Sequence, residues 1–437
     1  VVSTVSAAAT LVLVVGDRVG RAGFGYHRAA VCRRSGRVVV AWGADAVRRA
    51  YKFLLRPTVK QVQTLGECLE AHRLLYNAAL QERREAWQRA GVTIRYGDQS
   101  AQLKDIRRAD PGQACWSFSS QQATLRRLNL AFDGFFRRVK AGQTPGYPRF
   151  KGRGWWDTVV WPKDGDGCRW DPPPDSGLTR VYLQGVGHVR VHAHRRVEGR
   201  VKTISVKREG TCWYVILSCG DVPAQTLPPV NSPVGVDMGV AAFLTTNHGV
   251  QVPNPRYLAA SADRLTQAQQ ALARCERGSR RRGKARSRVA AVHRRVARQR
   301  LDHAHKTARW LVTHHDLICH EKLRITNMTR SAAGTVDAPG VNVAAKSGLN
   351  RSILDAGWGV FLRVLASKAE SAGRMVIAVN PANTSRTCPH CGHCARENRP
   401  TQADFTCVAC GYHGHADVVA ASNVLRAGLA LQTAQPA

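Results

Sequence analysis

The sequence predicts a multidomain α/β protein, and four observations support this fold class. The chain has 437 residues, enough for about two to four domains. Hydrophobic residues make up 44% of it, so sizeable cores can form. The second half alternates short apolar strands with helices, which is typical of an α/β domain with a mixed sheet. Residues 178–220 alternate apolar and polar side chains, which predicts a small antiparallel sheet or barrel.

The first 49 residues read differently from the rest, and we interpret residues 1–49 as an atypical N-terminal extension. They contain a short apolar run followed by scattered Arg and Gly, with no sustained helical or strand period. The sequence begins with Val. One hypothesis is therefore that an upstream start was assigned and that the functional protein begins near Arg49–Tyr51. The alternative is a genuine additional N-terminal segment.

Between residues 51 and 220 the pattern predicts a strand, two helices and then the sheet. A short strand at residues 51–56 ends at Pro57, and a helix follows from Val59. A second helix is expected over residues 119–140. The apolar positions predicted to lie on the helix faces are Val62, Leu65, Leu69, Leu75, Tyr76 and Ala79, then Leu125, Leu128, Phe132, Phe135 and Phe136. The strand pairs are predicted around Val181, Val189, Ile204 and Val215, with a hairpin turn at Gly210.

The second half is predicted to contain strands that end in carboxylates, separated by helices. A helical hairpin is expected over residues 261–314, broken near residues 278–283. The other expected elements are strands at 234–237, 317–321 and 375–379, a hairpin reaching Val252, and helices at 352–373 and 416–431.

The charge balance favours a polyanionic partner. The chain carries 65 Lys and Arg against 30 Asp and Glu, a formal net charge of +35. Residues 274–300 hold twelve of these cations and one acid, Glu276. Because pairing within the chain cannot balance this excess, we expect contact with nucleic acid. An anionic membrane surface is the alternative, but the charge is not confined to one amphipathic helix.

No stretch has the roughly 18 apolar residues of a membrane span, so no membrane is expected. Thirteen irregularly spaced cysteines do not resemble a secreted disulfide framework. The protein is therefore predicted to be cytoplasmic with reduced thiols. Within the loop at residues 142–154, the segment Tyr147–Lys151 has two interpretations: its aromatic rings stack on bases, or they anchor the core.

Two cysteine pairs, Cys388-x2-Cys391 and Cys407-x2-Cys410, have the spacing of a zinc ribbon. Four thiolates fill the tetrahedron that Zn2+ accepts, so the metal is predicted to be structural and not catalytic. Three nearby side chains are competing ligands: Cys394, His390 and His393.

Three carboxylates stand where predicted elements begin or end: Asp237 and Glu321 after strands, and Asp417 at a helix start. Taken alone, each is unremarkable, and an Asp at a helix start is usually an N-cap. Together they could meet at one edge of a sheet, where oxygen ligands suit Mg2+ or Mn2+. Two such ions about 3.5–4 Å apart would support phosphodiester hydrolysis.

Several motifs in a fixed order make residues 50–430 resemble the TnpB family, insertion-sequence proteins often described as transposases and related to CRISPR type V effectors. One departure is Val419, which stands where the family's final Asp-x-Asn-Ala-Ala motif usually has Asn. The matching motifs are Tyr51-Lys-Phe53, Gly146-Tyr-Pro-Arg-Phe-Lys151, Gly235-Val-Asp-Met-Gly239, Leu349–Gly357, Asn380–Ser385 and Asp417–Asn423.

The resemblance implies a wedge-like β-barrel over residues 50–58 and 155–228, interrupted by a helical recognition lobe at 59–150. It implies an RNase H-like, RuvC-type nuclease domain at 231–437, with the zinc ribbon, 386–412, inserted in it.

The resemblance also implies a function: a transposon-encoded endonuclease that uses a guide RNA from the transposon end to cleave double-stranded DNA. Asp237, Glu321 and Asp417 would be the catalytic residues and would hold Mg2+ or Mn2+. The protein would act as a monomer on one RNA, near the nucleoid of a bacterium or archaeon. Two alternatives stay open, a guided DNA-binding regulator without cleavage and an accessory transposase. The latter is disfavoured because no convincing Tyr or Ser recombinase motif is present.

Overall fold

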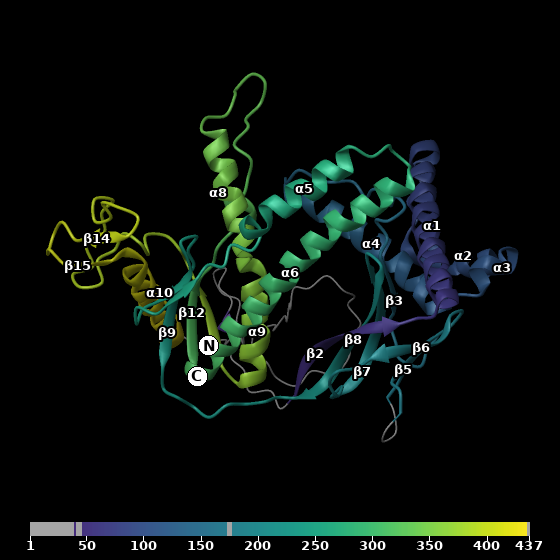
Figure 1. Ribbon diagram of the computed structural model, residues 1–437, viewed down its shortest axis with the longest axis horizontal. Helices are drawn as coiled ribbons and strands as arrows, with labels where there is room; N and C mark the ends of the chain where they lie inside the picture. Colours follow the sequence, from purple (N-terminus) through teal and green to yellow (C-terminus); the bar gives the residue numbers. More distant parts are fainter. Residues whose placement is uncertain (1–38, 41–45, 173–176, 435–437) are drawn as a thin grey trace, which may run out of the picture. The chain divides into compact units, whose positions relative to one another are not determined.

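The computed structural model describes residues 39–40, 46–172 and 177–434, which fall into two compact units (Figure 1). Ala46–Pro223 form the first, and the chain from Ala224 onward belongs to the second. Most of the predicted extension, residues 1–38 and 41–45, lies outside the described residues. In the described part of the chain, no helix has the length and apolarity needed to cross a membrane.

The first unit contains a seven-stranded antiparallel sheet in the order β3-β7-β8-β2-β6-β5-β4. The predicted period-two pattern is confirmed, since Val181, Val189, Ile204 and Val215 are all buried. The turn at Gly210, with φ of 67°, joins β7 to β8 as predicted. The strands are β2 (Ala46–Arg56), β3 (Thr158–Trp161), β4 (Cys168–Asp171), β5 (Arg180–Leu183), β6 (Gly187–His192), β7 (Arg200–Glu209) and β8 (Cys212–Pro223). Strand β2 begins at Ala46, five residues before Tyr51, the predicted start of this strand.

Four helices connect β2 to β3: α1 (Val59–Ala90), α2 (Tyr96–Ala109), α3 (Pro111–Ala114) and α4 (Phe118–Lys140). A capping box at Thr58 and Gln61 fixes the start of α1. Most predicted apolar positions are buried against neighbouring elements. Val62 and Phe136 are exceptions, because both are exposed.

The second unit is built on a six-stranded mixed sheet in the order β1-β13-β12-β9-β10-β11. The central strand β12 runs parallel to both neighbours, β9 and β13. The predicted strands and hairpin are confirmed as β9 (Pro233–Asp237), β10 (Ala242–Thr246), β11 (Gln251–Pro253), β12 (Leu317–Glu321) and β13 (Met375–Val379), with β1 (Val39–Val40) at the edge.

Helices cover both faces of this sheet (Figure 1). On one face, Val234, Val236 and Ile318 pack with residues of α6 (Arg280–His314) and α9 (Trp358–Ala372). On the other, Cys319 packs with Val424 of α10 (Ala416–Thr433). Alternate residues of each strand therefore enter different cores, which explains why these strands are apolar throughout.

The helix predicted at residues 352–373 is wrong in one respect, because it is two helices. Gly357 has φ of 73° and ends α8 (Val343–Ala356) before α9 begins. The left-handed backbone at this position stops the helical hydrogen-bond pattern. The predicted helical hairpin is confirmed as α5 (Ala262–Ala273) and α6. The remaining elements are η1 (Ala259–Ser261), α7 (Ile325–Met328), β14 (Asp404–Thr406) and β15 (His413–His415).

Asp355 at the end of α8 ties together segments that are distant in sequence. Its buried carboxylate accepts hydrogen bonds from the backbone amides of Leu258 and Ala259 and from the guanidinium of Arg300, at 2.5–3.3 Å. We predict that Asp355→Ala lowers the free energy of unfolding by about 3 kcal/mol, because several donors lose a buried acceptor. Urea denaturation of the full chain measures this. The matched control is Asp302→Ala, whose solvent-exposed pair with Lys306 should contribute little to stability.

Candidate functional site

The parallel pairing of β9 with β12 brings two of the predicted carboxylates to one sheet edge. The register pairs Val236 with His320. Asp237 and Glu321 are the next residues on these neighbouring strands, so both stand at the carboxyl ends of β9 and β12. Adjacent carboxyl ends of parallel strands are a common position for functional groups.

The third carboxylate arrives with α10, which lies unusually close to the sheet. A Cβ on Gly235 would stand 2.0 Å from the carbonyl oxygen of Ala421, and one on Gly428 would stand 2.1 Å from Cys319 Sγ. Both contacts are shorter than any side chain allows, so glycine is required at each position. This close approach sets the first turn of α10, which carries Asp417, beside the sheet edge.

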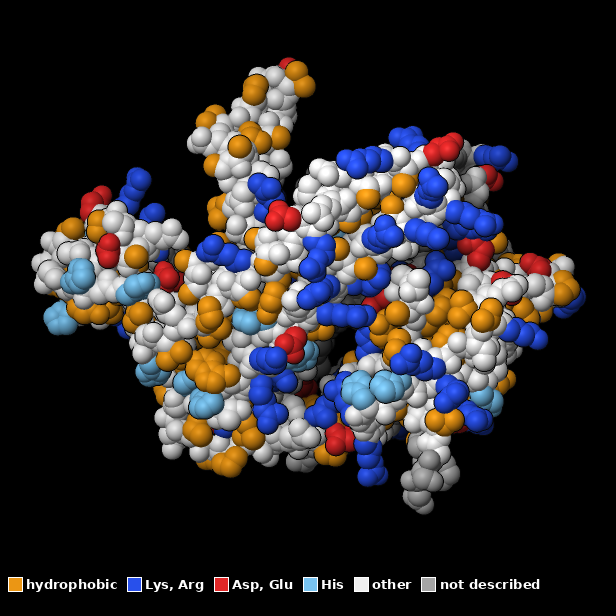
Figure 2. All heavy atoms as spheres, in the orientation of Figure 1, with side chains coloured by type: hydrophobic (Ala, Val, Ile, Leu, Met, Phe, Trp, Pro, Cys, Tyr) orange, Lys and Arg blue, Asp and Glu red, His pale blue; other side chains and the backbone are white. Residues whose placement is uncertain are grey.

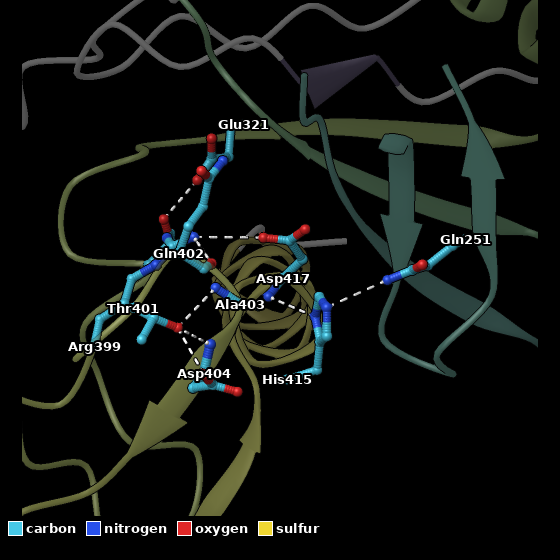
Figure 3. A network of polar contacts seen from close by, with 10 residues as sticks. Gln251, Glu321, Arg399, Thr401, Gln402, Ala403, Asp404, His415 and Asp417 are labelled. Carbon is cyan, nitrogen blue, oxygen red and sulfur yellow. Dashed lines mark hydrogen bonds and ion pairs between the residues drawn. The ribbon is translucent and has the colours of Figure 1, made fainter. Parts of the chain in front are cut away.

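Asp417 does not cap α10, so the interpretation of this residue as an N-cap is wrong. The N-cap is His415, whose Nδ1 accepts a hydrogen bond from the backbone amide of Asp417 at 3.2 Å. The Asp417 carboxylate is thereby left to interact with other groups. Figure 3 shows it facing Arg399 across the start of α10.

Burial and mutual repulsion act on these carboxylates. Burial, followed by the charges of Glu321 and Asp417, raises the pKa of Asp237 to about 7, against the opposing charge of Arg399. Burial likewise raises the pKa of Glu321, although a hydrogen bond from Thr384 and the charge of Arg399 oppose it. The repulsion among these carboxylates is thus only partly offset by the guanidinium of Arg399, a condition that favours binding of a cation.

The raised pKa of Asp237 predicts a pH-dependent stability in the protein without added divalent metal. From about pH 4 to 7 the folded state retains a proton that the unfolded state releases, so stability falls as pH rises through this window. Asp237→Asn should therefore be more stable than the wild type at pH 8, by on the order of 2 kcal/mol. The difference should vanish near pH 4. Urea titrations at both pH values measure it, and an equal difference at the two would contradict the argument.

Three residues of the site were missed by sequence reasoning. Arg399, between the cysteine pairs, places Nη2 3.5 Å from Asp417 Oδ1. The hydroxyl of Thr384 donates to Glu321 Oε1 at 2.5 Å. The buried side chain of Asn423 donates to the carbonyl oxygens of Thr384 and Thr387, at 2.8 and 2.7 Å. Asn423 and Thr384 lie in two of the recognised motifs, Asp417–Asn423 and Asn380–Ser385, which is the one signal available for them; nothing local distinguishes Arg399.

The carboxylates are chemically suited to Mg2+ or Mn2+, since both ions prefer oxygen ligands. The elevated pKa of Asp237 shows the crowding that a cation would relieve. The oxygens of the three carboxylates do not all lie within 4.8 Å of one another. In the described part of the chain, the group whose ligand atoms meet that distance is the four cysteines Cys388, Cys391, Cys407 and Cys410. A hollow of about 690 Å3, bordered by Gln251, Arg256, His415 and Asp417, adjoins the site.

The four predicted zinc ligands come together as one cluster. Cys388 Sγ lies 3.7 Å from Cys410 Sγ, and Cys391 Sγ lies 3.6 Å from Cys407 Sγ. Burial opposes ionisation of Cys407, but amide hydrogen bonds from Cys410 and Ala409 help to lower its pKa, while hydrogen bonds from the neighbouring thiols help to raise the pKa of Cys410. A thiolate at neutral pH is the form that binds zinc. The competing candidates Cys394, His390 and His393 are not members of this cluster.

A cationic surface lies on the second unit apart from the carboxylates. Figure 2 shows Lys and Arg side chains gathered over α6. This helix contains most of the Arg-rich segment at residues 274–300. Such a surface suits the phosphates of a nucleic acid.

Three family models match the chain. Residues 204–332 match a family described as "Probable transposase", and residues 358–424 match "Cas12f1-like, TNB domain". Residues 47–91 match a "Helix-turn-helix domain"; here they form most of β2, the long helix α1 and its C-cap.

Two relatives and one solved structure resemble most of the chain. It is 36% identical to "Putative RNA-guided DNA endonuclease InsQ" of Escherichia coli (strain K12), covering 88% of this chain and 93% of that protein. It is 29% identical to "Putative RNA-guided DNA endonuclease" of Streptomyces pristinaespiralis, covering 88% and 90%. The fold resembles a chain of "Cryo-EM structure of the Cas12f1-sgRNA-target DNA complex", with a TM-score of 0.53, 12% identity, and coverage of 87% and 99%.

Proposed function

This chain belongs to the TnpB family, and on that basis we propose that it is an RNA-guided endonuclease that hydrolyses double-stranded DNA. The resemblance seen in its motifs is thereby confirmed at the level of the family. Its relatives of similar length are named as RNA-guided DNA endonucleases. The proposal assigns cleavage to Asp237, Glu321 and Asp417.

The observation that supports this assignment is the placement of three carboxylates close enough for the charges of Glu321 and Asp417 to help raise the pKa of Asp237. They come from β9, β12 and α10, segments separated by more than 80 residues in sequence. Burying acidic groups beside one another lowers the stability of the fold, so such groups are found mainly at functional sites. Repulsion from Glu321 and Asp417 contributes directly to the raised pKa of Asp237.

In this proposal Asp237, Glu321 and Asp417 hold divalent ions. When bound, Mg2+ or Mn2+ supplies charge stabilisation for phosphodiester hydrolysis and lowers the pKa of an attacking water. Thr384 fixes the orientation of Glu321 through its hydrogen bond. Arg399 adds a positive charge at the edge of the site, where it favours approach of the phosphate backbone.

The remaining parts of the chain have supporting roles in the proposal. Residues 231–437 would be the RuvC-type nuclease domain, and the ribbon at 386–412 would use zinc to hold Arg399 near the carboxylates. Residues 50–58 and 155–228 would be the wedge-like barrel, and 59–150 the recognition lobe. Guide–target pairing would read the sequence, while the cationic surface holds the nucleic acid by its phosphates.

Plasmid cleavage by the purified ribonucleoprotein tests the function. The protein is loaded with RNA transcribed from the flanking transposon end and mixed with a matched target beside a randomised sequence, in Mg2+. We expect double-strand cleavage only with a matching guide, enriched for one adjacent motif. Guide-dependent binding without cleavage would contradict the nuclease proposal and favour the DNA-binding regulator.

A further inference from the structure

The segment that joins α4 to β3 in the first unit is both cationic and aromatic. Together with the last turn of α4, residues 137–156 include six Lys and Arg, and the acidic Asp157 follows directly before β3. The same segment holds Tyr147, Phe150, Trp155 and Trp156. The sequence left open whether the rings of Tyr147 and Phe150 anchor the core or face a ligand.

The middle of this loop is fixed on α1 by hydrogen bonds to its backbone. Asn77 accepts from the amide of Lys151 at 2.8 Å and donates to its carbonyl oxygen at 3.0 Å. Arg73 donates to the same oxygen at 2.8 Å. These contacts hold the backbone in a defined conformation without using the aromatic side chains.

The rings divide into anchored and outward-facing ones. Trp156 is buried, and Tyr147 packs edge-on against Phe132 and Phe135. Trp155 is 82% exposed and Phe150 is 45% exposed. Among the described residues, neither of these two rings contacts another aromatic ring. Two large apolar rings are thus presented to solvent on a fixed backbone.

We propose that Phe150 and Trp155 form a stacking platform for unpaired nucleotides of the RNA partner, with Arg149 and Arg153 beside the phosphates, the latter in exchange for its exposed ion pair with Glu70 at 3.7 Å. Flat rings stack on any base, and the adjacent cations complement the backbone charge. RNA is the occupant because single-stranded segments offer unstacked bases, whereas duplex DNA keeps its bases paired and stacked. This inference rests on the proposed function for the identity of the partner as RNA.

The test measures binding of the full-length protein to a fluorescent single-stranded oligouridylate across a range of salt concentrations. Phe150→Ala and Trp155→Ala should each weaken binding about 10-fold. The slope of affinity against salt should not change, because no phosphate contact is removed. Arg149→Gln should instead reduce that slope by about one. Phe150→Tyr and Trp155→Phe should retain affinity, which excludes misfolding as the cause.

Trp87→Ala is the matched control, since Trp87 is another exposed indole in the same unit, near the end of α1. An equal loss of oligouridylate affinity in Trp87→Ala, or no loss in Phe150→Ala and Trp155→Ala, would overturn the proposal of a stacking platform. A loss confined to duplex DNA would also overturn it. If the wild type bound neither oligouridylate nor transposon-end RNA, the proposed function would itself be contradicted, which distinguishes the two failures.

Discussion

Cys407→Ser is expected to release the zinc, unfold the ribbon and abolish DNA cleavage. Cys407 Sγ lies 3.6 Å from Cys391 Sγ within the four-thiol cluster, and a hydroxyl is a poor substitute for a thiolate ligand. Structural zinc supplies roughly 10 kcal/mol or more of folding free energy in small zinc domains, and the ribbon has little core of its own. Because Arg399 and the approach to Asp417 belong to this region, its loss should also remove activity.

Zinc content by mass spectrometry and tryptic cleavage after Arg396 report the two effects. Arg396 is exposed between the cysteine pairs, so trypsin should cut there once the ribbon opens. Cys394→Ser is the matched control, because Cys394 is exposed and outside the four-thiol cluster. It should retain zinc and resist trypsin. Zinc loss in both variants, or in neither, would show that the ligand assignment is wrong.

Glu321→Gln is expected to reduce cleavage about 1,000-fold or more, equivalent to about 4 kcal/mol of activation free energy. The change keeps the shape of the side chain but removes one negative charge from the metal-binding group. RNA binding should be unaffected, which a filter-binding assay of the same preparation establishes. Single-turnover cleavage in Mg2+ gives the rate.

Thr384→Val provides a graded comparison. It removes the hydroxyl that donates to Glu321 at 2.5 Å but leaves the carboxylate in place. Loss of a partner that orients a metal ligand typically costs about 10–100-fold. Equal defects in Glu321→Gln and Thr384→Val would indicate that Glu321 acts through structure and not as a ligand.

The four-cysteine cluster could be predicted from the sequence because its determinants are local. Each Cys-x2-Cys pair forms within a few residues, and the spacing alone indicated four ligands. The strands ending in Asp237 and Glu321 were predicted for a similar reason, from short apolar runs. Their proximity could be expected from the family resemblance but not from the local pattern, since it depends on the parallel register that sets Val236 beside His320.

Features that depend on contacts between distant segments were missed. Arg399 reaches Asp417 only through the fold of the ribbon. The helical pattern of the sequence continues through Gly357, so it did not predict that the helix divides into α8 and α9. Phe136 fits the apolar face of its helix, yet it is exposed. The prediction failed here because periodicity gives the face on which a side chain lies but does not show whether another element packs against that face.

Cleavage of one matched plasmid, measured for the wild type and Asp237→Ala under single-turnover conditions, tests whether Asp237 belongs to a nuclease site. Both proteins carry the transposon-end RNA and are assayed in Mg2+, with a mismatched guide as the control. We expect linear product from the wild type with the matched guide and none from Asp237→Ala, with equal guide-dependent DNA binding by both. Cleavage by Asp237→Ala at the wild-type rate would contradict the assignment of the nuclease site.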